Sequence, residues 1–425
     1  MKTRFALVDC NSFYAACEQV FNPKIRNKPV IVLSNNDGCI VARSKEAKAL
    51  GLKMAEPFFQ QEDLIKKNNV HVFSSNYILY GDMSRRVMET LQQFTPDLEI
   101  YSIDEAFLAF HSFPEDFDLF NYGKKIKDII QQWTGLPVSV GVGPTKTLAK
   151  LANSLAKKND EYHGVLDLTK SSDTDNFLKK VPVGDIWGIG WQYTKFLNQQ
   201  GIYNALELKN ANDQWIKKHL KVTGLRTVLE LRGTSCIPLE EAVPDKKGIL
   251  CSRSFGRSLT ELADLKEALA TFVTIAAEKL RAQKSAATCF TVFVTTSRHH
   301  AGPQYANSIP FMLPTPTAYT PELISQALAA LEKIFIKGYY YKKTGVMFFG
   351  LVPDHSIQLN LFTPAPNIEK QKKLMRAIDS INQEWGRNTI KSAATGIKKN
   401  WRMRQLRKSP RYTTCWEELL IAKAA

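Results

Sequence analysis

The stretch Phe-Ala-Leu-Val-Asp-Cys-Asn-Ser-Phe-Tyr at residues 5–14 holds the pattern that decides the fold of this chain. Its first four residues are apolar and rich in β-formers, which is typical of a short buried strand. Asp9 ends this strand, and residues 12–21 then follow with helical spacing. A carboxylate at the end of a buried strand is rare unless it is paired or liganded. Asp9 is therefore a candidate functional residue.

A second acidic pair, Asp104 and Glu105, lies within or beside the strand-like segment 100–110. Phosphoryl transfer uses carboxylates that hold two hard divalent cations about 4 Å apart. Taken singly, Asp9 could cap a helix and the other two could be solvated turn residues. Because apolar residues flank both positions, the sequence favours one metal-binding centre formed by all three carboxylates.

Apolar runs at 29–33 and 138–142 predict further buried strands, and helical spacing over 83–94, 122–133 and 145–157 predicts amphipathic helices. Strands interleaved with helices indicate an α/β first domain. The composition then changes along the chain, and the predicted parts are an α/β part at 1–170, a helical part at 171–235, a linker at 236–248, a small α+β part at 249–352 and an irregular, basic C-terminal region at 353–425.

The charge balance points to a polyanionic partner. The 425 residues carry a formal net charge of +16, with a pI near 9.4. Neutralising phosphates releases condensed counterions, so nucleic acid is the favoured partner class, although solubility alone could also explain the charge. Seven singly placed cysteines argue against a disulfide framework or a zinc site and favour a reducing cytoplasm. We expect no signal peptide and no membrane span.

Three ordered strings carry a resemblance to a known family. Residues 8–15 (VDCNSFYA), 101–107 (YSIDEAF) and 140–150 (VGVGPTKTLAK) resemble the first two motifs of Y-family DNA polymerases and the segment that follows them. The likeness runs through the whole chain and is strongest to the UmuC branch. It implies a multidomain α/β and α+β, right-hand-like polymerase. Its parts would be a palm with fingers at about 24–78, a helical thumb, a linker and an α+β little finger, in the order given above.

The resemblance implies error-prone translesion synthesis in the SOS response by two-metal nucleotidyl transfer. Asp9, Asp104 and Glu105, with the main-chain carbonyl of Cys10, would hold two Mg²⁺ ions. Tyr14 matches the steric gate, an aromatic plate that clashes with a 2′-hydroxyl and so selects deoxynucleotides.

The same resemblance assigns residues around the incoming nucleotide. Lys45, Lys48 and Lys157 match triphosphate-binding positions, although many relatives read Y-E-A-R where this chain has Lys-Glu-Ala-Lys. Lysine is a point charge rather than a planar fork. Cys39 and Val41 would alternate on a strand over the nascent base pair. Both are small and leave little surface to test base-pair shape, which predicts tolerance of damaged templates.

Contacts to the DNA backbone are expected from several basic or glycine-containing segments. Gly188 and Gly190 resemble the turn of a helix-hairpin-helix, where the backbone can approach a phosphate and a helix N-terminus can receive it. Additional phosphate contacts are expected from Lys146, Lys150, Arg253 and Arg257.

The C-terminal region resembles partner-binding segments. Gln358, Leu361 and Phe362 belong to a short peptide like those by which bacterial polymerases bind the sliding clamp. The stretch 391–411 contains basic but no acidic residues. It could be a solvated tail, but Trp401 and residues 409–414 resemble the UmuC-type C-terminal region. That resemblance implies assembly with a UmuD-type dimer and activation by RecA.

Other functions explain fewer of these features. A nucleotidyl cyclase would share paired metal carboxylates but would need neither the helix-hairpin-helix nor the clamp peptide. A non-catalytic DNA-binding protein would leave the three carboxylates without a role. A DinB-type polymerase without a dedicated partner remains an alternative, but Lys45, Lys48 and the 409–414 run favour the UmuC branch.

Overall fold

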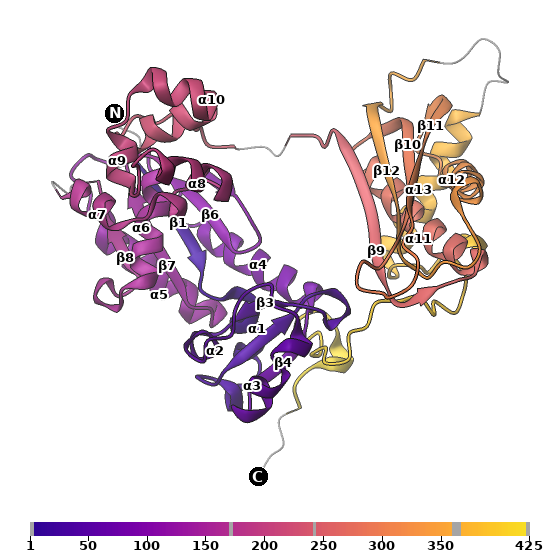
Figure 1. Ribbon diagram of the computed structural model, residues 1–425, viewed down its shortest axis with the longest axis horizontal. Coiled ribbons are helices and arrows are strands. Elements are labelled where there is room, and N and C mark those ends of the chain that lie inside the picture. Colours follow the sequence, from indigo (N-terminus) through magenta and orange to yellow (C-terminus); the bar gives the residue numbers. More distant parts are fainter. Residues whose placement is uncertain (1–3, 170–172, 241–243, 359–366, 422–425) are drawn as a thin grey trace. The chain divides into compact units, whose positions relative to one another are not determined.

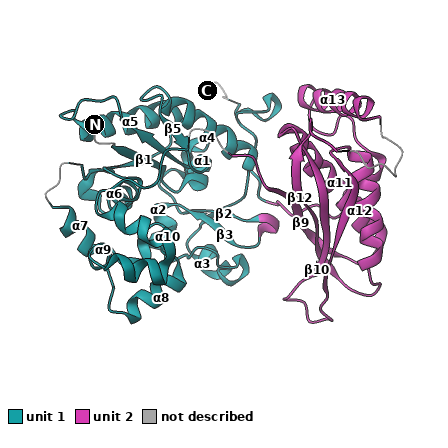
Figure 2. Ribbon diagram, turned by 90° about the horizontal axis from the view of Figure 1, so that it is seen from above, with its two compact units in different colours: residues 1–34, 38–243, 407–425 teal, residues 35–37, 244–406 magenta. Residues whose placement is uncertain are grey.

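The computed structural model describes residues 4–169, 173–240, 244–358 and 367–421. The chain forms two compact units, coloured separately in Figure 2. Unit 1 comprises residues 1–34, 38–243 and 407–425, and unit 2 comprises residues 35–37 and 244–406. The change from unit 1 to unit 2 after residue 243 falls inside the predicted linker, 236–248. Each unit has its own buried apolar core.

The main sheet of unit 1 has the strand order β5-β6-β1-β7-β8 (Figure 1). Its strands are β1 (Phe5–Cys10), β5 (Leu98–Ile100), β6 (Glu105–Ala109), β7 (Val138–Gly143) and β8 (Val165–Asp167). The central strand β1 pairs antiparallel with both β6 and β7, and all six of its residues are buried. Helices pack against this sheet because β1 carries apolar side chains on both faces and β7 carries three valines on one face. These helices are α4 (Tyr77–Leu91), α5 (Leu119–Thr134) and α6 (Lys146–Lys158).

A second, three-stranded sheet in unit 1 has the order β3-β2-β4. Its strands are β2 (Val30–Leu33), β3 (Ile40–Arg43) and β4 (His71–Ser74), and the nearby helices are α1 (Phe13–Val20), α2 (Lys45–Ala49) and α3 (Glu62–Lys67). The predicted strands at 29–33 and 138–142 and the predicted helix at 145–157 are confirmed within two residues. The helix predicted at 83–94 instead begins at Tyr77, a difference that matters for the site below.

The last part of unit 1 is helical, as predicted. It contains α7 (Thr174–Lys180), α8 (Trp191–Gln199), α9 (Ala205–Lys209) and α10 (Asp213–Leu231). Lys221 within α10 has a positive φ of 64°, which marks a break in the helix. Apolar side chains of α6 and these helices form one buried cluster, so the helical part is packed onto α6.

Unit 2 is built on a four-stranded sheet of order β11-β10-β12-β9. Its elements are β9 (Gly248–Leu259), α11 (Leu262–Ala282), β10 (Ser285–Thr296), β11 (Ala306–Thr317), α12 (Thr320–Ile334), β12 (Tyr341–Pro353) and α13 (Ile368–Glu384). The predicted α+β character is confirmed. Strand β11 was not predicted, because it contains Pro310, Pro314 and Pro316. Its position at the sheet edge explains how it tolerates them, since an edge strand has backbone donors that need no partner strand.

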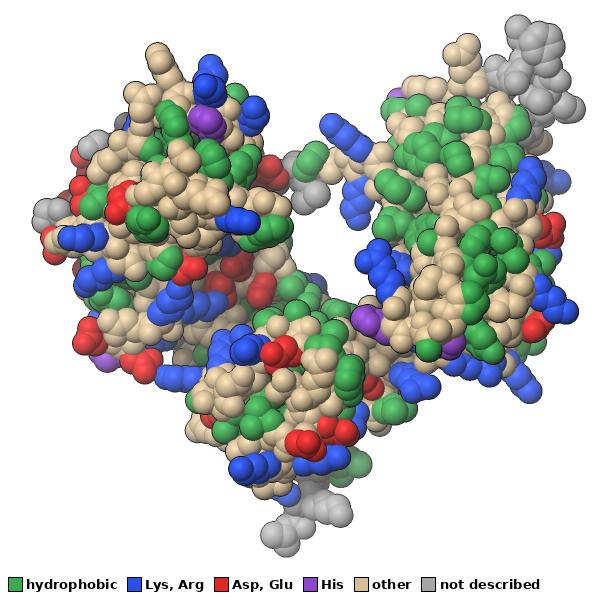
Figure 3. All heavy atoms as spheres, viewed as in Figure 1, with side chains coloured by type: hydrophobic (Ala, Val, Ile, Leu, Met, Phe, Trp, Pro, Cys, Tyr) green, Lys and Arg blue, Asp and Glu red, His purple; other side chains and the backbone are tan. Residues whose placement is uncertain are grey.

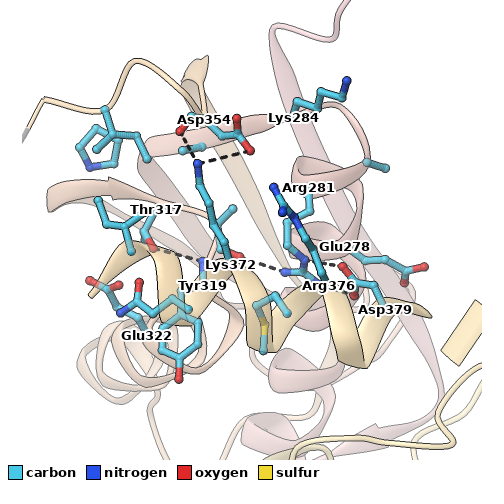
Figure 4. Close-up of a pocket in the computed structure, with 18 of the residues that line it drawn as sticks. Glu278, Arg281, Lys284, Thr317, Tyr319, Glu322, Asp354, Lys372, Arg376 and Asp379 are labelled. Carbon is cyan, nitrogen blue, oxygen red and sulfur yellow. Dashed lines mark hydrogen bonds and ion pairs between the residues drawn. The ribbon is translucent and has the colours of Figure 1, made fainter. Parts of the chain in front are cut away.

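Helix α13 also corrects the prediction that the chain is irregular beyond residue 353. It borders a cavity of about 970 Å³ in unit 2, whose charged side chains are shown in Figure 4. Arg281 donates two hydrogen bonds to the carboxylate of Asp379 at 2.6 and 2.7 Å. Lys372 donates to the main-chain carbonyl of Asp354 at 2.9 Å. These bonds tie α13 to α11 and to the end of β12, and no residue predicted to be functional lines the cavity.

The basic C-terminal stretch is packed rather than solvated. In unit 2, Trp401 is buried against Phe255 and Phe272, and its indole N–H donates to Glu267 at 3.0 Å. In unit 1, residues 407–414 form what we call the anchor segment. Ser409 in this segment is buried and donates to Glu18 Oε1 at 3.0 Å. The alternative of a wholly solvated tail is therefore wrong for these positions.

Glu18 predicts a pH dependence of stability. The side chain is 1% exposed, and burial raises its pKa from 4.5 to about 7, although hydrogen bonds from Tyr80 and Ser409 oppose the increase. The folded protein therefore retains a proton that the unfolded chain releases, and stability falls as pH rises from about 4.5 to about 7. Relative to Glu18→Gln, the wild-type unfolding free energy should decrease by up to about 3 kcal/mol across this window.

Urea unfolding of both proteins at pH 5, 6, 7 and 8 measures this effect. Parallel pH profiles for the wild type and Glu18→Gln would contradict it. The variant keeps an amide oxygen that can accept hydrogen bonds, so loss of the carboxylate charge is the main change.

Candidate active site

The pairing of β1 with β6 brings the predicted carboxylates to one end of the main sheet. Asp9 lies directly opposite Glu105 in the antiparallel register. The next residue along β1, Cys10, donates its backbone N–H to the carbonyl oxygen of Asp104 at 2.9 Å. Residues separated by more than ninety positions in the sequence thus become neighbours.

The segment predicted as one strand, 100–110, is interrupted before the acidic pair. β5 ends at Ile100 and β6 begins at Glu105. Ser102 closes the turn between them, because its Oγ accepts the backbone N–H groups of Asp104 and Glu105 at 3.2 and 3.1 Å. The same hydroxyl donates to Asp104 Oδ1 at 2.6 Å. A single strand would direct two adjacent side chains to opposite faces, whereas the turn frees Asp104 from that constraint.

Helix α6 supplies positive charge to the carboxylates. Lys150 Nζ donates to Glu105 Oε2 at 2.7 Å, and Lys157 forms an ion pair with Asp9. Two helical turns separate the lysines, which places them on the same side of α6. Both ion pairs border a cavity of about 240 Å³ that Trp187 also lines.

Burial raises the pKa of Asp9 to about 7; Lys157 lowers it and Glu105 raises it. The raised value reflects the cost of placing a charge in a site that is only 8% exposed. Asp9 therefore depends on a nearby cation such as Lys157 to remain ionised.

The donor set suits a hard divalent cation. Asp9, Asp104 and Glu105 provide carboxylate oxygens, and Cys10 provides a main-chain carbonyl. Burial, followed by the charges of Asp9 and Asp104, raises the pKa of the Cys10 thiol, which favours the neutral form rather than a thiolate ligand. In the described residues, however, no three His, Cys, Asp or Glu side chains are grouped closely enough to hold a metal. Asp104 is instead hydrogen-bonded to Ser102, and the two lysines pair with the other carboxylates.

Tyr14 lies in the first turn of α1 and belongs to an aromatic cluster with two residues of α4. Its ring stacks on Tyr80, with centroids 4.5 Å apart and an interplanar angle of 16°. Tyr77 contacts it edge-on at 6.0 Å. Sequence reasoning missed Tyr77 and Tyr80, because it began α4 too late. The i, i+3 spacing of these two tyrosines was the available signal.

The two lysines of α2 have different partners. Lys48 Nζ donates to Ser12 Oγ at 2.9 Å, close to Tyr14 in the sequence. Burial and then the charges of Lys157 and Arg43 lower the pKa of Lys48, which shows that it faces other cations. The side chain of Lys45 is 80% exposed and pairs with Asp160 at 3.1 Å. Lys48 is thus brought to the acidic centre, whereas Lys45 faces Asp160.

Cys39 and Val41 are partly exposed, while Ile40 and Ala42 between and after them are buried. This is the alternation expected of a strand. Val41 lies in β3, and Cys39 immediately precedes the strand in an isolated bridge with Pro57. The side predicted to face a base pair is therefore the more accessible one.

The structure contradicts the prediction that Lys146 contacts a DNA phosphate. Its side chain is 1% exposed, forms an ion pair with Glu99 and donates to the carbonyl of Pro238 at 2.7 Å. Its ammonium also lies 5.0 Å from the centre of the Phe107 ring. The periodicity of α6 could not reveal this burial, because Glu99 and Pro238 come from other elements. Lys146 has a structural role and is not available to a phosphate.

The other predicted DNA contacts are accessible or conformationally suitable. Gly188 has a φ of +90°, a conformation that favours glycine, and Gly190 is the N-cap of α8. Arg253 and Arg257 are exposed on β9. On the face seen in Figure 3, Lys and Arg side chains are spread over both units.

The predicted clamp peptide is only partly visible. Gln358 is exposed, whereas Leu361 and Phe362 lie outside the described residues. None of the helices in the described ranges is both long and apolar enough to span a membrane.

Comparison with known proteins shows the family to which the chain belongs. Residues 8–154 match the impB/mucB/samB family, residues 246–361 match the C-terminal domain of that family, and residues 372–422 match a domain of unknown function, DUF4113. Protein UmuC of Salmonella typhimurium is 43% identical over 99% of this chain and 100% of its own length. DNA polymerase IV 1 of Bacillus subtilis is 27% identical over 91% of this chain and 92% of its own length.

Solved structures show the same fold. A Y-family DNA polymerase chimera, Dbh-Dpo4(243-245)-Dbh, has a TM-score of 0.63 at 20% identity and covers 82% of this chain and 99% of its own. DinB from Sulfolobus solfataricus has a TM-score of 0.51 at 21% identity and covers 84% of this chain and all of its own.

The fold is therefore that of a Y-family DNA polymerase. The chain belongs to the impB/mucB/samB family and is a UmuC-like member of it. Its activity is DNA-directed DNA polymerisation, in the form of error-prone translesion synthesis in the SOS response.

Removing the buried Lys146 charge should destabilise unit 1. Lys146→Met leaves the Glu99 carboxylate buried without its cation, which should lower the unfolding free energy by about 3 kcal/mol. The double variant Lys146→Met/Glu99→Leu should recover much of that loss, because no unpaired charge remains. Urea unfolding measures both effects. Wild-type stability in Lys146→Met, combined with weaker and less salt-dependent DNA binding, would restore the phosphate-contact assignment.

Proposed function

We propose that unit 1 performs templated nucleotidyl transfer at Asp9, Asp104 and Glu105, with two Mg²⁺ ions bound by these carboxylates and the Cys10 carbonyl. The observation that carries the proposal is the register that sets Asp9 opposite Glu105, beside Asp104. Bound there, such ions would activate the attacking 3′-hydroxyl and stabilise the leaving pyrophosphate.

The protein itself positions the nucleotide around this centre. Lys157 and Lys48 provide positive charge on the α6 and α2 sides, where a triphosphate would bind. Lys45, held by Asp160 at the surface, has at most a secondary part in this binding. Tyr14 forms the plate against which the deoxyribose lies and excludes a 2′-hydroxyl. Cys39 and Val41 cover the nascent base pair. Because their side chains are small, the site tolerates distorted template bases.

DNA is held mainly through its backbone. Gly188 and Gly190 allow a phosphate to approach the N-terminus of α8, as in a helix-hairpin-helix. Arg253 and Arg257 contact phosphates from β9, and Lys150 contributes when it is not paired with Glu105. Such contacts position a duplex without reading its sequence. In polymerase terms, residues 1–170 form the palm and fingers, 171–235 the thumb, and 249–352 the little finger.

The C-terminal region supplies partner contacts. We propose that residues 358–362 bind the sliding clamp, with Gln358 at the rim of the clamp pocket and Leu361 and Phe362 inside it. By likeness to the UmuC branch, the chain assembles with a UmuD-type dimer and is activated by RecA in the cytoplasm.

Asp104→Asn tests the metal centre. The substitution preserves size but removes a negative ligand, so nucleotide incorporation with Mg²⁺ should fall roughly a thousandfold while primer-template binding is retained. Primer extension on intact and abasic templates, with and without clamp, UmuD-type and RecA proteins, measures this loss. Asp128→Asn, at an exposed position of α5, is the matched control. Undiminished extension by Asp104→Asn would refute the proposed centre.

Tyr14→Ala tests the sugar plate. Removing the ring opens space for a 2′-hydroxyl, so the preference for deoxyribonucleotides over ribonucleotides, as a ratio of kcat/KM values, should fall by roughly a hundredfold. Single-nucleotide incorporation kinetics measure the ratio. An unchanged preference would show that another residue selects the sugar.

A further inference from the structure

The ring of Tyr14 stacks on Tyr80, and the hydroxyl of Tyr80 is held by a buried hydrogen bond. The hydroxyl of Tyr80 donates to Glu18 Oε1 at 2.6 Å, and that oxygen also accepts a hydrogen bond from Ser409 Oγ at 3.0 Å. Tyr80, Glu18 and Ser409 are 0%, 1% and 7% exposed. The stacked ring is therefore attached, through one buried carboxylate oxygen, to the C-terminal region.

The anchor segment is itself held by several independent contacts. Residue 408 forms a parallel bridge with Ser74 and extends the β3-β2-β4 sheet beyond its β4 edge. The Ser74 backbone N–H donates to the Arg407 carbonyl at 3.0 Å, and the Arg407 N–H donates to Ser74 Oγ at 3.0 Å. Farther along the segment, Tyr412 stacks on Phe21 with centroids 4.9 Å apart. The contacts of residues 407 and 408 before Ser409 and of Tyr412 after it therefore hold Ser409 in position.

The same segment fixes the start of the helix that carries Tyr77 and Tyr80. Asn76, the N-cap of α4, is fully buried. Its side-chain amide donates to the Ser409 carbonyl and hydroxyl oxygens at 3.0 Å each, and to the Pro410 carbonyl at 3.2 Å. Glu18 lies on α1, one turn beyond Tyr14. The anchor segment therefore contacts both helices whose aromatic side chains meet at Tyr14.

We propose that the anchor segment is a positioning element of the nucleotide site, in which Ser409 acts through Glu18 and Tyr80 to hold the Tyr14 ring in place. This inference rests on the proposed role of Tyr14 as the sugar plate. It assigns a role in sugar selection to the last part of the region that matches a domain of unknown function, residues 372–422. A positioning role follows from the geometry because Ser409 hydrogen-bonds to Glu18 and Asn76, whereas Tyr80 stacks on Tyr14.

Two substitutions that remove one hydroxyl each test the proposal in the full-length chain. Tyr80→Phe keeps the stacked ring but removes its attachment, and Ser409→Ala removes the second donor to the same oxygen. Each should lower the deoxyribonucleotide-to-ribonucleotide ratio of kcat/KM roughly tenfold, chiefly through a higher KM for the deoxynucleotide, while primer-template affinity stays unchanged. Because both donors share Glu18 Oε1, the double variant should lose less than the product of the single effects.

Matched controls separate positioning from a general loss of stability. Tyr122→Phe removes a hydroxyl that donates to the Phe94 carbonyl at 2.9 Å in unit 1, and Ser285→Ala removes a buried serine hydroxyl in unit 2. Both should leave the ratio at the wild-type value. If Tyr80→Phe and Ser409→Ala unfold more easily than the wild type but keep its ratio, the segment is merely structural and the inference fails.

Tyr14→Ala distinguishes this failure from failure of the proposed function. If Tyr14→Ala loses sugar discrimination but Tyr80→Phe and Ser409→Ala do not, only the positioning inference is overturned. If Tyr14→Ala also keeps the wild-type ratio, the sugar-plate role fails and the inference fails with it. Should Ser409→Ala not fold, Tyr80→Phe alone decides, because it preserves the packed ring.

Discussion

The antiparallel register of β1 against β6 is the constraint on which the proposed active centre depends. It places Asp9 opposite Glu105 and brings the Asp104 main chain to Cys10. A shift of one residue would turn every side chain of β1 to the other face of the sheet. The apolar residues of β1 are buried on both sides, so burial and pairing together keep the carboxylates at the same end of the sheet.

Lysines of α6 balance the negative charge at this end of the sheet. The helix packs on the sheet through apolar residues, and the same packing directs Lys150 and Lys157 to Glu105 and Asp9. A charge on the buried Asp9 would otherwise be costly, as the raised pKa of this residue shows. Lys146 on the same helix points elsewhere and neutralises Glu99 within the fold. One helix therefore supplies cations both to Asp9 and Glu105 and to a buried ion pair with Glu99.

Relatives similar over the full chain and solved structures of the same fold place this architecture among the Y-family polymerases. If Cys39 and Val41 cover the nascent base pair as proposed, their short side chains place few steric demands on it, which suits an enzyme that copies damaged templates. The packing of Trp401 in unit 2 and Ser409 in unit 1 shows that the basic C-terminal stretch is integrated into the fold.

The sequence by itself determined the family and the α/β and α+β order of the parts. It also predicted Asp9, Asp104 and Glu105 as one acidic group, and the structure places them next to one another. These features are carried by local strings and by periodicity, which depend on neighbouring residues. It did not predict β11, whose prolines are tolerated only at a sheet edge, or the early start of α4. Nor could it predict the ion pair of Lys146 with Glu99, or the hydrogen bonds of Tyr80 and Ser409 to Glu18. Only the tertiary structure decided those pairings, because each joins residues that are distant in the sequence. Burial, rather than residue type, determines whether a lysine or a hydroxyl group reaches solvent.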